Sequence, residues 1–195
     1  IFRQSKDSLI AYNAKFINEG NTKLFYGPDF VFVSGDSQED TAEKITERYC
    51  REIQESGIEN VQILSPFRSE GAASAEQLNE TIRELVNPFC SAEEEIKFGP
   101  RIFRVNDRIM QTKNTEKVSN GDLGFILYIK DTDQGKKIGM DFGAGRTLEY
   151  GVDDLNNVDL AYATTIHKAM GSEYETVIMP LLKAHTIMMY RNLLY

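Results

Sequence analysis

The stretch ATTIHKAMGSEYETVIMPL places several polar side chains in a short loop between two apolar runs. Thr165, His167, Lys168 and Glu173 can each form hydrogen bonds with a polar ligand. Gly171 lets a ligand approach the backbone closely, because it has no side chain. A strand that ends in a polar loop before another buried strand often carries a ligand site in α/β proteins. These residue types and their spacing therefore predict a binding site, although they do not identify the ligand.

The same residues also have plainer interpretations, which the sequence leaves open. His167 could be a structural histidine whose hydrogen bonds are satisfied within the fold, and Lys168 could be an exposed charge. Gly-Ser-Glu is a common turn sequence, in which Glu173 would be a solvated acid.

A second loop with binding potential follows the apolar run NVQIL. Ser65, Phe67 and Arg68 come directly after this predicted strand, where ligands gather in parallel sheets. An aromatic ring can stack on a nucleobase and an arginine can neutralise a phosphate, so the loop is compatible with a nucleic-acid ligand. The alternative for Phe67 is a place in the hydrophobic core.

The elements that would position these loops alternate between helix and strand. Helical periodicity and capping residues predict helices over 6–20, 37–57 and 74–87, and another in the final ten residues. Apolar runs predict buried strands at 29–35, 60–67, 158–167 and 176–182, and these lengths are typical of a parallel sheet with helical crossovers.

The residues from about 100 to 157 have a different texture. Short alternating runs are separated by glycine-rich turns, a pattern that predicts an antiparallel meander closed into a small β-barrel. Asn120, Gly121 and Asp122 have the composition of a turn. Basic residues cluster near the start of this region, and Arg108 and Lys113 are therefore candidate contacts to nucleic acid.

Composition limits the classes of protein that the chain can represent. With 195 residues and 41% hydrophobic residues it can bury a sizeable core. The net charge of −8 argues against a protein that coats nucleic acid through bulk charge. We expect no membrane partner and a cytoplasmic location, because no long apolar run or leader is present, and we expect Cys50 and Cys90 to be reduced thiols with no metal site.

Several separated patterns together resemble the second motor domain of superfamily 1 helicases, most closely the RecD-like DNA helicases related to the exodeoxyribonuclease V alpha subunit. IFRQ resembles the segment after the third motif of that family, QILSPFR resembles the opening of its second RecA-like domain, and DRIMQTKN with VSNGDLGFI resembles its inserted barrel. LAYATTIHKAMGSEYETVIMPL is similar to motif V, and RNLLY is similar to the residues before motif VI.

The resemblance implies roles for particular residues in an ATP-dependent motor. Arg3 would be the catalytic arginine that contacts the γ-phosphate, while Gly171 and Glu173 would bind the nucleotide. Contacts to single-stranded DNA would come from both loops and the basic stretch, namely Ser65, Phe67, Arg68, Arg108, Lys113, Thr165, His167 and Lys168.

The sequence departs from the helicase pattern in three ways. It has neither a G-x-x-x-x-G-K-[ST] phosphate loop nor a Walker B acid pair, so we expect ATP with Mg²⁺ to be bound mainly by a first RecA-like domain outside this chain. Because both motifs are absent, we expect this chain to be inactive alone, and its last residues come just before the place of motif VI. Ala169 and Met170 stand where relatives carry Ser and Gln, which puts one polar contact in doubt.

The expected fold is therefore an α/β, RecA-like parallel-sheet domain with an inserted SH3-like β-barrel. We expect the RecA-like domain at 1–99 and 158–195 and the barrel at 100–157. The expected partners are single-stranded DNA, ATP, the N-terminal RecA-like domain, and nuclease or helicase subunits. A non-catalytic module that binds nucleic acid or a partner remains the alternative, and a small-molecule enzyme is disfavoured because the two histidines provide no nucleophile–base pair or metal cluster.

Overall fold

We describe the protein from a computed structural model in which residues 8–183 are described. Arg3 and the last twelve residues, which include the predicted final helix and RNLLY, lie outside this range. Within it, none of the helices is long and apolar enough to cross a membrane. The same range contains no group of three or more His, Cys, Asp or Glu side chains that could hold a metal ion.

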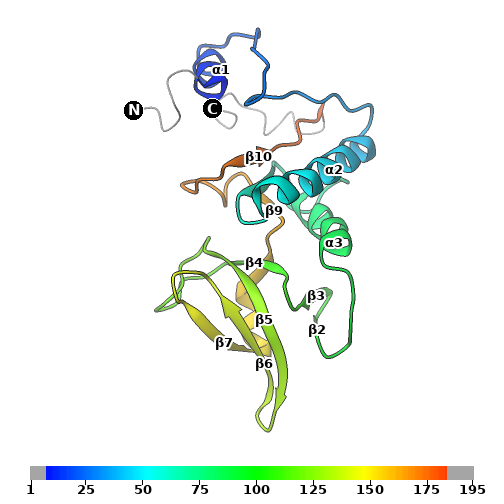
Figure 1. Cartoon of the computed structure of the whole chain (residues 1–195), viewed down its shortest axis with the longest axis vertical. Coiled ribbons are helices and arrows are strands. Elements are labelled where there is room, and N and C mark those ends of the chain that lie inside the picture. The colour runs from blue at the N-terminus through cyan, green and yellow to red at the C-terminus, as the bar shows by residue number, and fades with distance from the viewer. Residues whose placement is uncertain (1–7, 184–195) are drawn as a thin grey trace.

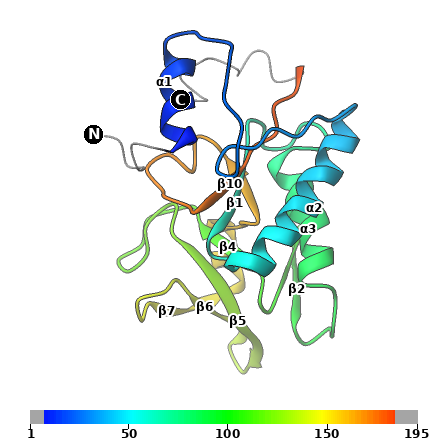
Figure 2. The same cartoon turned by 45° about the horizontal axis from the view of Figure 1, so that its top comes forward.

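A parallel sheet lies at the centre of the described chain (Figures 1 and 2). Its strand order is β10 (Thr176–Ile178), β1 (Val61–Ser65) and β9 (Ala163–Thr165), and both pairings with β1 are parallel. Helices α2 (Gln38–Ser56) and α3 (Ala75–Val86) pack against this sheet and share one core with it. That core contains Tyr49, Ile63, Leu78, Ile82 and Tyr162 among others.

Local capping chemistry starts both helices where the sequence predicts. The Ser37 side chain accepts a hydrogen bond from the Asp40 backbone N–H at 3.0 Å, and the Ser74 side chain accepts one from Gln77 at 3.4 Å. Gly57 follows α2 with a positive φ of 90°, a conformation that glycine adopts without strain. Upstream, α1 (Leu9–Asn18) confirms the first predicted helix.

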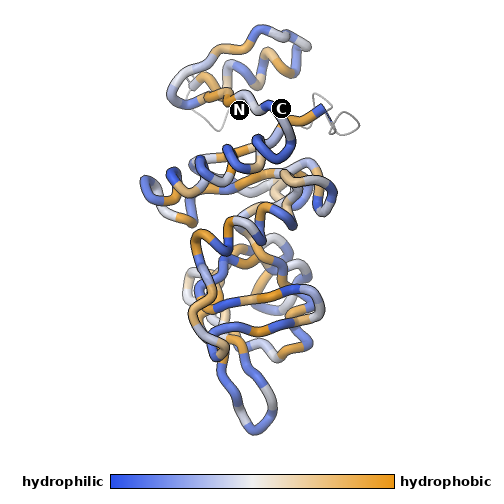
Figure 3. Tube along the Cα trace, turned by 90° about the vertical axis from the view of Figure 1, so that its right-hand side faces the viewer, coloured by the Kyte–Doolittle hydropathy of each residue, from blue (hydrophilic) through white to orange (hydrophobic). Residues whose placement is uncertain are grey.

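The second half of the chain forms an antiparallel sheet with the order β7, β6, β5, β4, β8. Strands β4 (Arg108–Gln111), β5 (Leu123–Thr132), β6 (Gly135–Asp141) and β7 (Thr147–Gly151) are followed by the 3₁₀ helix η1 (Val152–Asn157) and β8 (Val158–Leu160). A hairpin of β2 (Glu95–Phe98) and β3 (Arg101–Arg104) precedes them. The sheet has its own buried core, which includes Phe103, Ile126 and Met140. Figure 3 shows that the tip of the β5–β6 hairpin is hydrophilic.

The predicted single strand over 158–167 is wrong. The chain pairs antiparallel with β4 through β8, bends at Ala161 and Tyr162, and then pairs parallel with β1 through β9. An apolar run indicates burial but not the partner strand, so the change from one sheet to the other leaves no signal in hydropathy.

The predicted buried strand over 29–35 is also wrong. This segment is irregular, and Val31, Phe32 and Val33 are 55%, 64% and 58% exposed. Gly27 and Phe30 form an isolated bridge around a turn that contains Pro28 and Asp29. The turn takes up the start of the run, and none of the described strands pairs with the remainder.

Candidate functional site

The two predicted loops lie side by side because their strands are neighbours. β1 and β9 run parallel, and Ser65 pairs with Thr165 at their carboxyl ends. The residues that follow each strand therefore leave the sheet at the same edge, which is where α/β proteins commonly bind ligands. Arg68 on one loop and Lys168 on the other both approach the Asp159 carboxylate. We call these two loops, residues 65–74 and 165–173, the strand-end loops.

Internal hydrogen bonds hold the first strand-end loop in place. The Ser65 hydroxyl donates to the Ala73 carbonyl at 2.8 Å and accepts from the Phe67 backbone N–H at 3.3 Å. The first turn of α3 donates backbone N–H groups to the carbonyls of Phe67 and Arg68, at 3.0 and 2.9 Å. Ser65 is fully buried, so the prediction that its hydroxyl contacts DNA is wrong for this conformation, and its role is to shape the loop. Phe67 is half-buried and Arg68 is exposed.

A tight turn forms the second strand-end loop. The Thr165 carbonyl accepts hydrogen bonds from the backbone N–H groups of Lys168 and Ala169, at 3.0 and 3.2 Å. The half-buried Thr165 hydroxyl oxygen also accepts from the Lys168 N–H at 3.4 Å. This turn leaves the His167 side chain exposed.

The loop then turns again toward β10. Gly171 has a φ of 91°, so a side chain at this position would be strained, and no heavy atom lies within 4 Å of where its Cβ would be. Glu173 is exposed two residues later. Of the two residues that depart from the helicase pattern, Met170 is 75% exposed and Ala169 is buried.

Asp159 connects the two strand-end loops to the antiparallel sheet. One of its carboxylate oxygens accepts the Lys168 ammonium at 2.8 Å and lies 3.9 Å from the Arg68 guanidinium, and the other accepts from Arg101 at 3.1 Å. Arg68 also pairs with Glu76 at 2.8 Å, and this hydrogen bond raises the pKa of Arg68. We call these five residues the Asp159 cluster. It contains three cations and two carboxylates, so it carries a positive surplus.

Arg108 does not belong to this surface. Its side chain is 1% exposed, and its guanidinium donates to the carbonyls of Val61 at 2.6 Å and Glu59 at 3.4 Å. The prediction that it contacts DNA is therefore wrong for this conformation. β4 alternates its side chains between two packed faces, so a basic residue in the strand can be directed inward to satisfy backbone carbonyls at the start of β1.

Lys113 lies in the exposed loop after β4, and its carbonyl accepts from the Gln111 side chain at 2.8 Å. The predicted turn at Asn120, Gly121 and Asp122 is confirmed. Gly121 has a φ of 95°, and the Asp122 carboxylate accepts from the Ser119 backbone N–H at 3.0 Å and pairs with Arg146.

A buried polar network that sequence reasoning missed lies where the two sheets join. The Tyr162 hydroxyl donates to the Asp107 carboxylate at 3.0 Å, and Asn87 donates to the same oxygen at 2.8 Å. The second Asp107 oxygen accepts the Arg104 backbone N–H at 2.7 Å. Burial raises the pKa of Asp107 despite these bonds, and it raises the pKa of Tyr162 as well. The only sequence signal was a tyrosine within an apolar run.

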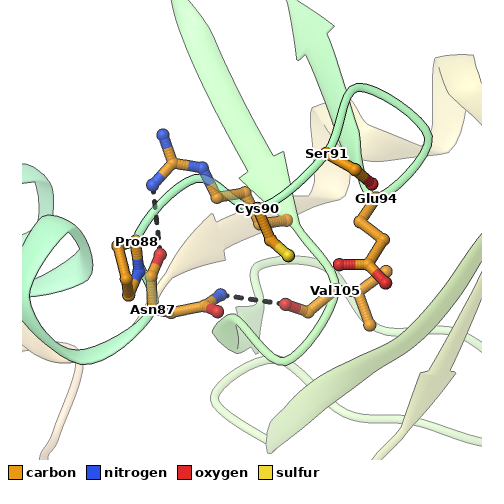
Figure 4. Close-up of a pocket in the computed structure, with 7 residues that line it drawn as sticks. Asn87, Pro88, Cys90, Ser91, Glu94 and Val105 are labelled. Carbon is orange, nitrogen blue, oxygen red and sulfur yellow. Dashed lines mark hydrogen bonds between the residues drawn. The ribbon is translucent and has the colours of Figure 1, made fainter.

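A small pocket lies elsewhere, between the end of α3 and the β2–β3 hairpin (Figure 4). Arg104 donates to the Asn87 carbonyl at 3.1 Å across it, and the Asn87 amide donates to the Val105 carbonyl at 2.9 Å. These bonds join the end of α3 to the β2–β3 hairpin and the residue after it, so we regard the pocket as part of the packing around the hairpin.

Comparison with known proteins identifies two regions of the chain. Residues 78–142 match the family model described as the ATP-dependent RecD-like DNA helicase SH3 domain. Residues 160–195, which include the second strand-end loop, match the UvrD-like helicase C-terminal domain. The ATP-dependent RecD2 DNA helicase of Deinococcus radiodurans is 36% identical over 137 residues, which cover 69% of this chain and 18% of that protein. The chain thus spans less than a fifth of the length of this curated relative.

Two solved structures of Pif1 helicases have a weaker likeness. A structure of two Pif1 helicases at forked double-stranded DNA matches with a TM-score of 0.48 and 17% identity, and the match covers 92% of this chain and 41% of the Pif1 chain. Bacteroides sp. Pif1 with ADP-AlF4 matches with a TM-score of 0.43 and 16% identity, and the match covers 100% of this chain and 47% of the Pif1 chain. The assignment therefore rests on the sequence matches. With its RecA-like parallel sheet and SH3-like insertion, the chain belongs to the RecD-like superfamily 1 helicases.

Proposed function

We propose that this chain is the second motor domain of an ATP-dependent DNA helicase. In this role it provides one wall of the ATP cleft and a surface for single-stranded DNA. The observation that carries the proposal is the meeting of the two strand-end loops at one sheet edge, where an aromatic ring, an imidazole and several cations gather. These groups suit a single strand, because cations neutralise phosphates and rings stack on bases.

The nucleotide would be bound at the far end of the second strand-end loop. Glu173 is exposed and suits the hydroxyl groups of a ribose, and Gly171 leaves space for close approach of the nucleotide. Within residues 8–183 no carboxylate cluster fits a metal ion, so Mg²⁺ and most of the phosphate contacts would come from a first RecA-like domain. The role proposed for Arg3 in sensing the γ-phosphate stays a prediction, since this residue lies outside the described part of the chain.

The proposed motor works by changing the populations of open and closed states. ATP that contacts both RecA-like domains favours closure, and loss of the γ-phosphate removes that preference. Because Thr165 and Glu173 lie in one short loop, a shift of that loop would alter the grip on DNA and the nucleotide contact together.

Single-strand binding by variants of the full-length protein tests the proposed surface. We expect Lys168→Ala to weaken binding of a fluorescent oligothymidine and to make the salt dependence shallower by about 0.7 in log–log slope, the value for one phosphate contact. His167→Ala and Phe67→Ala should also weaken binding. Lys136→Ala is the matched control, because Lys136 is 34% exposed and pairs with a carboxylate, as Lys168 does at 33%, but lies in the β5–β6 hairpin.

If Lys168→Ala, His167→Ala and Phe67→Ala all bind the oligonucleotide as the unmodified protein does, the strand-end loops are not the DNA surface.

A second assay addresses the division of the ATP site between this chain and another domain. We expect the 195-residue chain alone to show no Mg²⁺-dependent ATP turnover, and sustained turnover would contradict the assignment of most phosphate contacts to another domain.

A further inference from the structure

We propose that Asp159 competes with DNA phosphates for the cations of the strand-end loops. This inference rests on the proposed function of these loops and adds a regulatory residue to it. The Asp159 carboxylate meets the loop cations as an anionic ligand would. It accepts the Lys168 ammonium at 2.8 Å and lies 3.9 Å from the guanidinium of Arg68. A backbone phosphate of a single strand would present the same kind of oxygen to these cations.

The three cations of the Asp159 cluster differ in how firmly they are held. Arg101 donates to the carbonyls of Val158 at 2.6 Å and Leu155 at 3.0 Å in addition to Asp159. Its guanidinium also lies 5.3 Å from the centre of the Phe98 ring, a favourable cation–π distance. Arg101 is therefore fixed to the antiparallel sheet and keeps Asp159 in position.

Fewer interactions hold the side chains of Lys168 and Arg68 in place. The Lys168 ammonium pairs with Asp159, and the Arg68 side chain is 62% exposed. Both cations are on the strand-end loops and have long side chains that can rotate toward solvent without backbone movement. A phosphate that arrives at this edge can therefore take both cations from Asp159, while Arg101 remains on the carboxylate.

This exchange would make binding weaker and easier to reverse. The ion pairs with Asp159 must be broken before DNA binds, so part of the attraction of Lys168 and Arg68 for DNA is offset. A motor that releases and rebinds its strand needs such reversibility. Removing the negative charge should free Lys168, leave Arg68 paired with Glu76 alone, and tighten the grip of this domain on the strand.

The test is oligothymidine binding by the full-length protein with Asp159→Asn, measured by fluorescence anisotropy between low and high salt. We expect binding about two- to fivefold tighter, the range for loss of one partly exposed ion pair, with a steeper salt dependence. Asp131→Asn is the matched control, because it removes the same charge and releases Lys136, but in the β5–β6 hairpin. It should leave affinity nearly unchanged.

A double-mutant cycle separates competition from a purely structural role. In the Lys168→Ala background, Asp159→Asn should lose most of its effect, because the released ammonium is no longer there. Unchanged or weaker binding by Asp159→Asn, or an equal gain in both backgrounds, would overturn the competition. If Lys168→Ala itself leaves binding unchanged, the proposed DNA surface fails first, and the two failures are thereby distinguished. Asp159→Glu, which keeps the charge, should bind like the unmodified protein, and a gain in binding equal to that of Asp159→Asn would contradict a role for the charge.

Discussion

The junction between the two sheets should depend on one buried hydroxyl group. Tyr162 is fully buried, and its hydroxyl donates to the Asp107 carboxylate at 3.0 Å and accepts from the Arg108 backbone N–H at 3.4 Å. Tyr162→Phe removes this hydroxyl and keeps the ring, so it leaves almost no cavity. A hydrogen bond to a charged group contributes about 1.5–3 kcal/mol, and we expect the free energy of unfolding to fall by that amount.

Tyr128→Phe provides a matched control for this substitution. The Tyr128 hydroxyl also donates to a carboxylate at 3.0 Å, that of Glu149, but on the surface of the antiparallel sheet. Solvent replaces a lost hydrogen bond there, so we expect a change within about 0.5 kcal/mol. Both substitutions remove a hydroxyl that donates to a carboxylate at 3.0 Å, so the comparison tests the effect of burial together with loss of the bond from the Arg108 N–H.

Urea unfolding of the 195-residue chain, followed by circular dichroism and by tyrosine fluorescence, measures both variants. Coincident transitions by the two probes would establish two-state behaviour before any free energy is compared. For a chain of this size the expected loss corresponds to a decrease in Tm of about 3–12 °C. Equal effects of Tyr162→Phe and Tyr128→Phe would refute the reasoning, as would an unchanged midpoint for Tyr162→Phe.

Two further predictions concern the same junction and the nucleotide. Burial raises the pKa of Asp107 in the folded chain, so the stability linked to its proton is present below the unfolded pKa and is lost as pH rises through the folded pKa. The loss of unfolding free energy caused by Asp107→Asn should therefore become smaller as pH rises from about 4 to 7, because the unmodified chain itself loses stability over that range. Urea titrations that give the same loss at every pH would contradict this. Glu173→Gln should weaken binding of a fluorescent ATP analogue to the full-length protein by about three- to tenfold, the loss expected for one charge-assisted hydrogen bond with partial solvent exposure. Glu175→Gln, which changes a similarly exposed acid two residues away, should leave the affinity unchanged. Equal affinities for both variants would exclude the ribose contact.

The sequence predicted the elements whose signals are local. Ser37 and Ser74 begin α2 and α3 through their own side chains, and the apolar run over 61–65 is a buried strand. The glycine-punctuated region forms the antiparallel sheet as expected. The sequence also placed both loops at the carboxyl ends of strands, and the structure adds that these strands are neighbours, so that the loops leave the same edge of the sheet.

The errors arose where pairing or direction depends on distant residues. Hydropathy could not show that the run over 158–167 changes sheets, or that Val31 to Val33 would find no strand partner among the described residues. The basic character of Arg108 suggested a surface contact, yet the carbonyls that bind it belong to residues 47 and 49 positions earlier. Asp159 attracted no notice because the cations that define its role come from three separate elements.

The change of sheets within 158–165 gives a physical reason for coupling between the SH3-like insertion and the strand-end loops. β8 is bound to β4 of the insertion, and only two residues later β9 is bound to β1 of the RecA-like sheet. An extended chain spans about 3.3 Å per residue, and a connection this short therefore cannot absorb a large displacement. Any movement of the insertion must therefore strain the Asp107–Tyr162 bond or carry β9 and its loop along. Asp159 lies in β8, just before that connection, so the carboxylate that binds Lys168 would move with the insertion, and force on the insertion would act on the cations of the loop.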